Sequence, residues 1–424
     1  FLARVDSARF MVNPNDLGEL AAVLARARVD LMALASGKPS IEIADQLRHL
    51  DRATFAASGV VVDATAPVEL MVPGEEYQVL LSVWNAGTKP VSVGMTLASA
   101  DSAAHLEWDR GVDSCVLLQP GEIRRQKLQV RVPPGAEATT PAYLEAPREG
   151  EMYSGPVAIS PRDPVLLQGV FHGCEGALGE TRREVVFRTN DQSRGEVRRP
   201  LRIVPRVEVA LSPAVEIWST TRQVAHTFTV GLTRHGNERV TGTVGLDLPE
   251  GWAPVEPRRF ELNVDGESET FAFAVSAPAG QPAATLAIRA WALDSAGERF
   301  DAGVRTIDYP HIRARTNAVP AVTDLHLAEI AFPALERVGY VRGAADRVPE
   351  ALVRAGLPVE LMDRNALERS ELSRFDALII GPRAYETDTA LVENTPRLLA
   401  WVRNGGLMVV QYQQYAYFRR GYAP

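Results

Sequence analysis

The spacing of apolar residues changes twice along this chain, and each pattern predicts a different kind of fold. In residues 1–57, apolar residues recur every three or four positions, which is typical of amphipathic helices. From about Val60 they alternate with polar residues, as in "YQVLLSVWNAG", which predicts half-buried strands. After residue 312, short apolar runs alternate with helical segments. A chain with three such patterns requires several separate cores.

We therefore predict a multidomain, mainly β protein in four parts. Residues 1–57 form a helical segment that is too short for an independent core. Residues 58–205 and 206–312 each supply enough short strands, separated by turn residues, for an immunoglobulin-like antiparallel β-sandwich. Residues 313–424 predict βαβ units with a parallel sheet covered on both faces. This α/β part has fewer strands than a complete doubly wound domain, so we expect it to be truncated.

Composition argues against two classes of partner. Lysine and arginine number 45 against 53 acidic residues, a net charge of −8, and no basic run is present that could neutralise a nucleic-acid backbone. No apolar stretch approaches the roughly 20 residues that span a bilayer, so we expect no membrane span. Phe1 is neither an initiator methionine nor the start of a signal peptide, and we expect the chain to be a piece of a longer protein.

Cysteine and histidine spacing predicts no metal site and no cofactor in these residues. Cys115 and Cys174 are too few for a disulfide scaffold or a four-ligand zinc site, and whether they pair is left open. The seven histidines form no His-x-x-His pair. The phrase "FHGCEG" places three possible metal ligands together, His172, Cys174 and Glu175. Their position at the edge of a predicted strand is a simpler explanation than a metal site.

The phrase "VGYVRGAADRVPEAL" runs from an apolar strand through a turn into a helix. Open α/β sheets bind ligands at such strand ends. However, Gly343 is the only glycine in the turn, and the spacings of a dinucleotide fingerprint or a phosphate loop are absent. The favoured interpretation is that Gly343 turns the chain, Asp346 caps the helix, and Pro349 occupies its first turn.

Two further strand ends carry candidate ligand-binding side chains. In "IIGPRAY", Arg383 either faces an anionic ligand or pairs with a local carboxylate such as Glu386 or Asp388. In "VVQYQQYAYF", amide and aromatic side chains after Gln411 either bind a sugar or pack at an interface. The predicted ligand-binding residues are Arg342, Asp346, Arg383, Tyr385, Gln411 and Gln413. No catalytic residue is predicted, because neither cysteine lies in this part of the chain.

Several phrases, in order, resemble the carboxyl-terminal region of long bacterial PIG-L (LmbE-like) family deacetylases. They are "MVPGEEYQVLLSVWNAG", "GEVRRPLRIVP", "VGYVRGAADRVPEAL", "VELMD", "LSRFDALIIGPRAY" and "NTPRLLAWVRNGGLMVVQYQQY". The resemblance implies a zinc-dependent N-acetylglucosaminyl deacetylase domain, then sandwich modules, then an α/β domain similar to ThuA or class I amidotransferases. The family's His-Pro-Asp-Asp and His-x-x-His motifs are absent here, so no catalytic residue is carried over. Zinc is expected in the missing amino-terminal domain, to which residues 1–57 would connect.

Two functions follow as hypotheses. The first is a non-catalytic accessory region of such a deacetylase, with a carbohydrate or glycoconjugate and the missing catalytic domain as partners. The alternative is that the α/β domain is itself a ThuA-like sugar-processing enzyme, completed by residues after 424, and Arg342, Arg383 and Gln411 motivate it. The resemblance is compatible with a periplasmic or secreted location, while the sequence itself leaves compartment, substrate and oligomeric state open.

Overall fold

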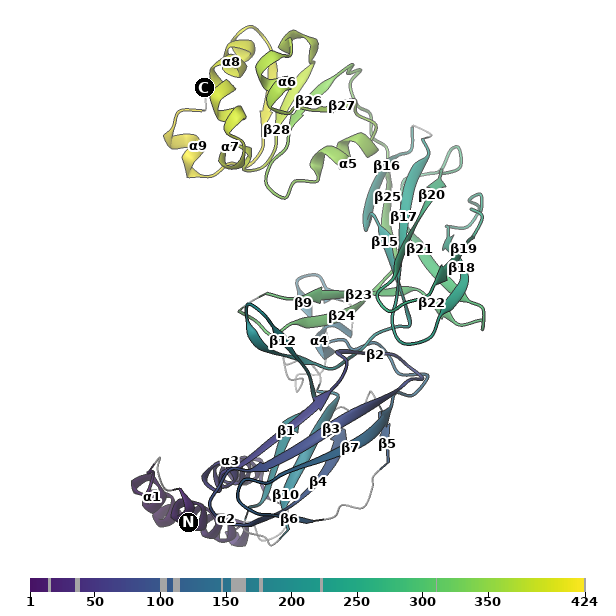
Figure 1. The fold of residues 1–424 in the computed structure, drawn as a ribbon. Coiled ribbons are helices and arrows are strands. Elements are labelled where there is room, and N and C mark those ends of the chain that lie inside the picture. Colours follow the sequence, from purple (N-terminus) through teal and green to yellow (C-terminus); the bar gives the residue numbers. More distant parts are fainter. Residues whose placement is uncertain are drawn as a thin grey trace.

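The computed structural model is mainly β, with several separate sheets and a smaller number of helices, as the sequence patterns predict. It describes residues 1–13, 17–34, 39–99, 105–109, 115–145, 148–153, 165–174, 178–221, 224–309 and 311–422. The chain follows a curved path from the amino-terminal helices through two β regions to a separate α/β region (Figure 1). Among the described residues, no helix is both long and apolar enough to cross a membrane.

The amino-terminal segment forms three helices, α1 (Leu2–Phe10), α2 (Gly18–Leu34) and α3 (Ile41–Ala57). Apolar residues of α2 spaced three and four apart, such as Val23 and Ala27, face α3 and form a small core of their own. Asp51 links this segment to the next region, because its carboxylate accepts a hydrogen bond from the Glu180 amide. Within the segment, the same carboxylate pairs with Arg28 at 2.5 Å. The segment thus has a small core of its own, contrary to the prediction, and it also packs on the first β region through Phe55 of α3.

The first β region consists of two facing sheets that share one core. One sheet has the order β13-β12-β1-β3-β7-β5 and the other β11-β10-β4-β6. Their strands are β1 (Val60–Ala66), β3 (Glu76–Asn85), β4 (Val91–Ser99), β5 (Glu107–Trp108), β6 (Val116–Leu118), β7 (Ile123–Arg131), β10 (Leu167–Gly173), β11 (Glu180–Glu184), β12 (Val186–Asp191) and β13 (Gly195–Pro200). Alternate residues of β3, including Val79, Leu81 and Val83, point into the core opposite Phe171 of β10.

Short elements complete this region. They are β2 (Leu70–Met71), α4 (Ala142–Glu145), β8 (Arg148–Glu149), β9 (Met152–Tyr153) and β14 (Arg202–Ile203). β2 pairs with β14 in parallel, and β8 pairs with β9. The β2–β14 pair lies where the chain leaves the first region for the second (Figure 1).

The second β region also has two sheets around one core. The sheet β15-β17-β20 faces the sheet β16-β25-β21-β18-β19, and β22 pairs with β21. Their strands are β15 (Val207–Ser212), β16 (Val215–Ser219), β17 (His226–Arg234), β18 (Val240–Asp247), β19 (Arg258–Leu262), β20 (Ser268–Val275), β21 (Ala284–Asp294), β22 (Arg299–Phe300) and β25 (Val322–Ala328). This core extends to Leu327, past the predicted boundary at residue 312. The boundary was placed too early because β25 is held by pairing with the distant strands β16 and β21, which a local pattern does not reveal.

A hairpin leaves the second region and reaches the first. It consists of β23 (Ala302–Ile307) and β24 (Arg315–Pro320), which pair only with each other among the described strands. The Arg202 guanidinium donates to the Ala314 carbonyl at 2.6 Å, and the Ala318 amide donates to the Thr140 hydroxyl at 3.0 Å. Glu75 accepts hydrogen bonds from the amide and side chain of Asn237 on the opposite side of the junction. The two β regions are therefore joined by directed polar contacts.

The last region contains a four-stranded parallel sheet of order β27-β26-β28-β29. Its elements are β26 (Val338–Val341), α5 (Val348–Arg354), β27 (Val359–Leu361), α6 (Arg364–Arg369), η1 (Leu372–Arg374), β28 (Ala377–Ile380), α7 (Ala384–Thr387), α8 (Thr389–Arg403), β29 (Leu407–Val410) and α9 (Tyr415–Arg419). The central strands β26 and β28 are almost wholly buried, as expected for parallel strands that are covered on both faces. Their carboxyl ends bring the predicted ligand-binding residues to one edge.

Candidate functional site

The carboxyl ends of β26 and β28 meet in a very close backbone contact. A Cβ atom on Gly343 would lie 2.0 Å from the Pro382 carbonyl oxygen, and one on Gly381 would lie 2.5 Å from the Gly343 nitrogen. The Ala344 amide donates to the Pro382 carbonyl at 2.9 Å. In open α/β sheets the ligand crevice opens at this point. Here the chain's own backbone fills it, which is why glycine is required on both strands.

Asp346 organises the turn after β26. Its carboxylate accepts hydrogen bonds from the amides of Gly343 (3.0 Å) and Val348 (2.9 Å) and from the Tyr340 hydroxyl (2.8 Å). Val348 is the first residue of α5 and Arg347 is its N-cap, so Asp346 binds the first amide of the helix from one position before the cap that the sequence predicts it to be. The Asp346 side chain is buried and fully used in this turn.

Tyr340 is the centre of the hydrogen-bond network around Asp346, and the sequence pattern does not single it out. Its ring is wholly buried in β26, and its hydroxyl lies between the Asp346 carboxylate and the Gln411 side-chain oxygen, 3.2 Å away. Burial, followed by the hydrogen bond to Asp346, raises the pKa of Tyr340. Inside the apolar run "VGYV" this tyrosine has the pattern of a core residue, so only the three-dimensional neighbours reveal its polar role.

Arg342 is held by the chain itself. Its guanidinium donates to the Asp346 carbonyl at 2.6 Å and forms an ion pair with Glu350 of α5. The hydrogen bond from Arg342 holds the pKa of Glu350 below its usual range. The side chain spans the turn to α5.

Arg383 pairs with Glu386, which is one of the two local carboxylates that the sequence offered. The Nε–Oε2 distance is 2.9 Å, and Arg383 lies in the left-handed region with φ 58° at the start of α7. Its amide donates to the Tyr412 carbonyl at 2.8 Å, which ties the end of β28 to the segment after β29. About half of the side chain remains exposed.

Gln413 and Tyr385 are buried where β28 and β29 end. The Gln413 amide group donates to the carbonyls of Gly381 (2.8 Å) and Gln411 (3.1 Å), and its oxygen accepts from the Tyr385 amide. The Tyr385 ring stacks on Tyr422 with centroids 5.0 Å apart, and burial raises its pKa. The six predicted residues thus share one edge of the sheet. Most of their polar atoms bind the chain itself.

Aromatic side chains near the carboxyl end divide into buried and exposed groups. Tyr417 is buried against Tyr385. Tyr412, Tyr415 and Phe418 are 68%, 79% and 67% exposed. These three side chains offer flat apolar surface to solvent.

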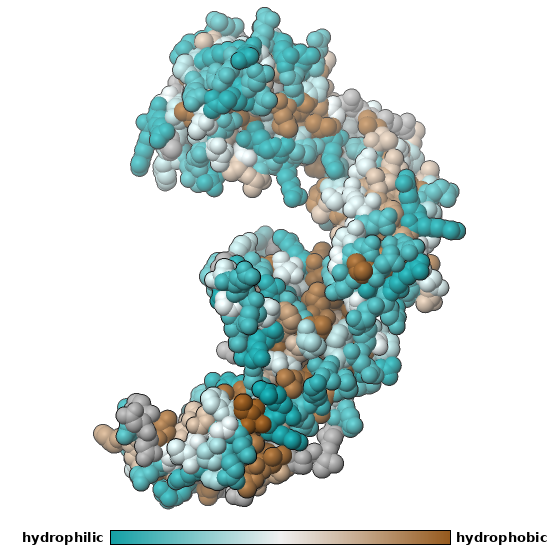
Figure 2. Space-filling model, viewed as in Figure 1, coloured by the Kyte–Doolittle hydropathy of each residue, from teal (hydrophilic) through white to brown (hydrophobic). Residues whose placement is uncertain are grey.

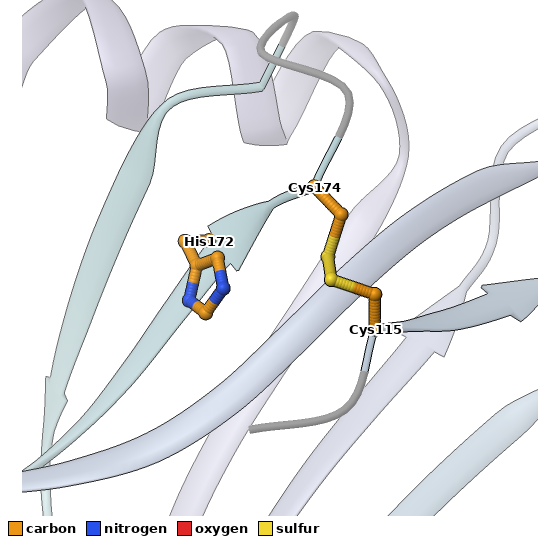
Figure 3. Close-up of side chains that lie close together, drawn as sticks. All are labelled: Cys115, His172 and Cys174. Atoms are coloured by element: carbon orange, nitrogen blue, oxygen red, sulfur yellow. A yellow bond between two sulfur atoms is a disulfide. The ribbon is translucent and has the colours of Figure 1, made fainter. Parts of the chain in front are cut away.

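A separate group of potential metal ligands lies in the first β region (Figure 3). Cys115 and Cys174 form a disulfide with Cα atoms 6.0 Å apart, and the ligand atoms of His172 and both cysteines lie within 4.8 Å of one another. Because both sulfurs are in the disulfide, neither is a thiolate, and this group does not fit zinc. Glu175, from the same phrase, lies outside the described residues. The open question of cysteine pairing is thereby answered.

Comparisons with known proteins give no family. No family model matches the sequence, and no curated protein matches it. A protein of unknown function from Porphyromonas gingivalis W83 is 14% identical with a TM-score of 0.20, over 63% of this chain and 99% of that chain. Native alpha-2-macroglobulin from Escherichia coli, from domain MG7 to its C-terminus, is 12% identical with a TM-score of 0.22, over 45% and 23%. Red sea bream transglutaminase is 10% identical with a TM-score of 0.27, over 66% and 34%.

Proposed function

We propose that these residues form a non-catalytic accessory region of a PIG-L-type deacetylase, an amide hydrolase that acts on N-acetylated sugars. In this proposal the β regions position the catalytic domain, and the α/β region recognises a glycan or partner. The proposal starts from the ordered phrases that resemble this family. In this family zinc would be held by the catalytic domain; in these residues the Cys115–Cys174 disulfide leaves no thiolate ligand beside His172.

Strand order supports an immunoglobulin-like assignment for the second β region. When the edge strand β16 and the short strand β22 are left out of the count, its first, second and fifth strands, β15, β17 and β20, form one sheet. The third, fourth, sixth and last, β18, β19, β21 and β25, lie in the other. Immunoglobulin-like sandwiches divide strands A, B and E from C, F and G in the same way.

Strand order likewise supports an amidotransferase-like assignment for the α/β region. Numbered along the chain, its parallel strands have the order 2-1-3-4. Flavodoxin-like sheets begin with this order, and their ligands bind beside the first and third strands. In this chain that position is closed by the Gly343–Gly381 contact.

One observation carries the non-catalytic part of the proposal: the strand-end side chains are already committed to one another. Arg342 binds Glu350, Arg383 binds Glu386, and the Gln411 side-chain oxygen lies 3.2 Å from the Tyr340 hydroxyl. An active site needs a base or nucleophile that faces substrate rather than a structural partner. The exposed rings between residues 412 and 418 are better suited to stacking on a sugar.

The disulfide supports a location outside the cytoplasm. Such bonds form and persist in oxidising compartments and are uncommon in the cytosol. A periplasmic or secreted parent protein would match the resemblance.

Saturation-transfer NMR with N-acetylglucosamine tests the recognition role. We expect signal transfer to the sugar protons, and we expect it to fall when Tyr412, Tyr415 and Phe418 are together replaced by alanine. Tyr309→Ala, which removes a 57% exposed ring from the second β region, is the matched control. Absence of transfer to the wild-type chain would refute glycan recognition.

A second assay tests the non-catalytic assignment. The purified chain, supplied with zinc, should release no acetate from N-acetylglucosamine conjugates. Metal-dependent release at a rate proportional to the amount of chain would show that the assignment is wrong.

A further inference from the structure

A cleft of about 1270 Å³ lies between the second β region and the α/β region. One wall is β16, and the other is the turn after β26 together with α5 (Figure 1). Val215 and Ile217 of β16 line the cleft and are 56% and 52% exposed, and Phe332 adds a third apolar side chain. Apolar residues are visible at this junction on the surface in Figure 2.

The strand that lines this cleft has an open hydrogen-bonding edge. β16 is the last strand of its sheet and pairs only with β25 among the described strands. The Asp324 amide of β25 donates to the Ala214 carbonyl, and the Thr220 amide donates to the Ala328 carbonyl. Along a strand in a parallel pair, alternate residues direct their backbone groups to the partner. Even-numbered residues of β16 therefore face β25, and Val215 and Ile217 present N–H and C=O groups to the cleft.

Within β16 itself, no proline and no exposed charged side chain blocks the open edge, and α5 faces this edge across the cleft. Natural sheets block their edges with charged side chains, proline or bulges. The one charged side chain in β16 is that of Glu216, which is buried and paired with Arg354 of α5. The side chains beside the open backbone groups are apolar.

Charges in the cleft favour an occupant with a carboxylate. The ion pairs Arg342–Glu350 and Arg354–Glu216 are already formed. Arg347 is exposed on the same wall; it forms no ion pair within 4.0 Å among the described residues, and Glu350 interacts with its charge at longer range. An acidic side chain of a bound segment would supply its partner.

We propose that this cleft binds an extended peptide segment of a partner protein, which adds to β16 as a further strand. Its backbone would pair with Val215 and Ile217, and one acidic side chain would reach Arg347. At strand spacing, a five-residue segment in a sheet occupies about 800 Å³, so the cleft has room for one strand. α5 forms the facing wall of the cleft. This inference does not depend on the proposed deacetylase context.

The test uses the 424-residue chain and a fluorescein-labelled peptide of alternating valine and threonine with one central glutamate. We expect saturable binding by fluorescence anisotropy, together with slower hydrogen exchange at the amides of Val215 and Ile217. A peptide with proline in place of a valine beside the glutamate should bind about tenfold more weakly, which corresponds to about 1.4 kcal/mol. This comparison uses wild-type protein, so it holds even if a protein variant fails to fold.

Variants of the protein then distinguish the contribution of the β16 edge to peptide binding from that of the Arg347 charge. Ile217→Pro removes an outward-facing donor without breaking a bond to β25, and it should weaken binding about tenfold because strand addition depends on that donor. Arg347→Glu should weaken binding of the glutamate peptide and strengthen binding of a peptide with lysine in its place. Arg305→Glu, which changes an exposed residue of β23, should alter the binding of neither peptide.

Three outcomes would overturn the proposal. They are no saturable binding, equal binding of the proline peptide, and protection of the same amides by self-association of the chain without peptide. The last would identify a second copy as the occupant.

Discussion

Removal of the Cys115–Cys174 disulfide should destabilise the first β region by a large and calculable amount. The bond closes a loop between residues 59 positions apart and ties the start of β6 to the end of β10. In the chain-entropy treatment, opening a loop of this length costs about 4 kcal/mol of stability. For a region of this size that corresponds to a fall of about 10 °C in melting temperature.

The perturbation is the double variant Cys115→Ala and Cys174→Ala, compared with wild type before and after reduction. Scanning calorimetry gives the melting temperature, and hydrogen exchange at the β10 amides assigns the transition to the first β region. Reduced wild type and the double variant should unfold together, below oxidised wild type, and reductant should not change the variant. If oxidised wild type and the variant melt at the same temperature, the bond does not constrain this region and the reasoning fails.

Three further predictions concern the strand-end network and its junction. Gly343→Ala should destabilise the α/β region by about 3 kcal/mol or more because its Cβ meets backbone, whereas Gly231→Ala, with open space around it, should be neutral in the same urea titration. Tyr340→Phe should cost about 1–3 kcal/mol at neutral pH through the lost hydrogen bond. Burial raises the pKa of Tyr340, so the folded chain keeps the proton that the unfolded chain releases above about pH 10. Wild type should therefore lose stability above that pH, and its advantage over the phenylalanine variant should shrink; a constant difference would contradict this. Arg354→Ala leaves the buried Glu216 carboxylate without its cationic partner, with only the Trp218 Nε1 hydrogen bond remaining, and should cost about 2 kcal/mol; adding Glu216→Gln should recover most of it in a double-mutant cycle.

Sequence patterns predicted the broad architecture because periodicity reports which face of each element is buried. The alternation in β3 and the buried run of β26 both lie where that pattern placed them. Local chemistry was also informative: Asp346 binds the first amide of α5, and Arg383 pairs with Glu386 three positions later. Such contacts span few residues, so the sequence contains both partners side by side.

Features that depend on distant pairing were not predictable. The close approach of Gly343 to Gly381 joins two turns 38 positions apart, and neither turn by itself reveals that the other fills its crevice. The Tyr340 hydroxyl also lies 3.2 Å from Gln411, which follows β29 and is 71 positions away in the chain. The placement of β25 in the second β region depends on β16, more than 100 positions earlier in the chain. Local periodicity reports only on residues that are close in the chain, so it does not predict any of these contacts.

The β23–β24 hairpin has a mechanical consequence. Because it projects from the second β region and is bonded to Thr140 and Arg202 in the first, bending at this joint would shear several hydrogen bonds at once. A pulling force applied at the chain ends would therefore act on the two β regions as one stiff unit. The connection to the α/β region is crossed by the Arg354–Glu216 ion pair.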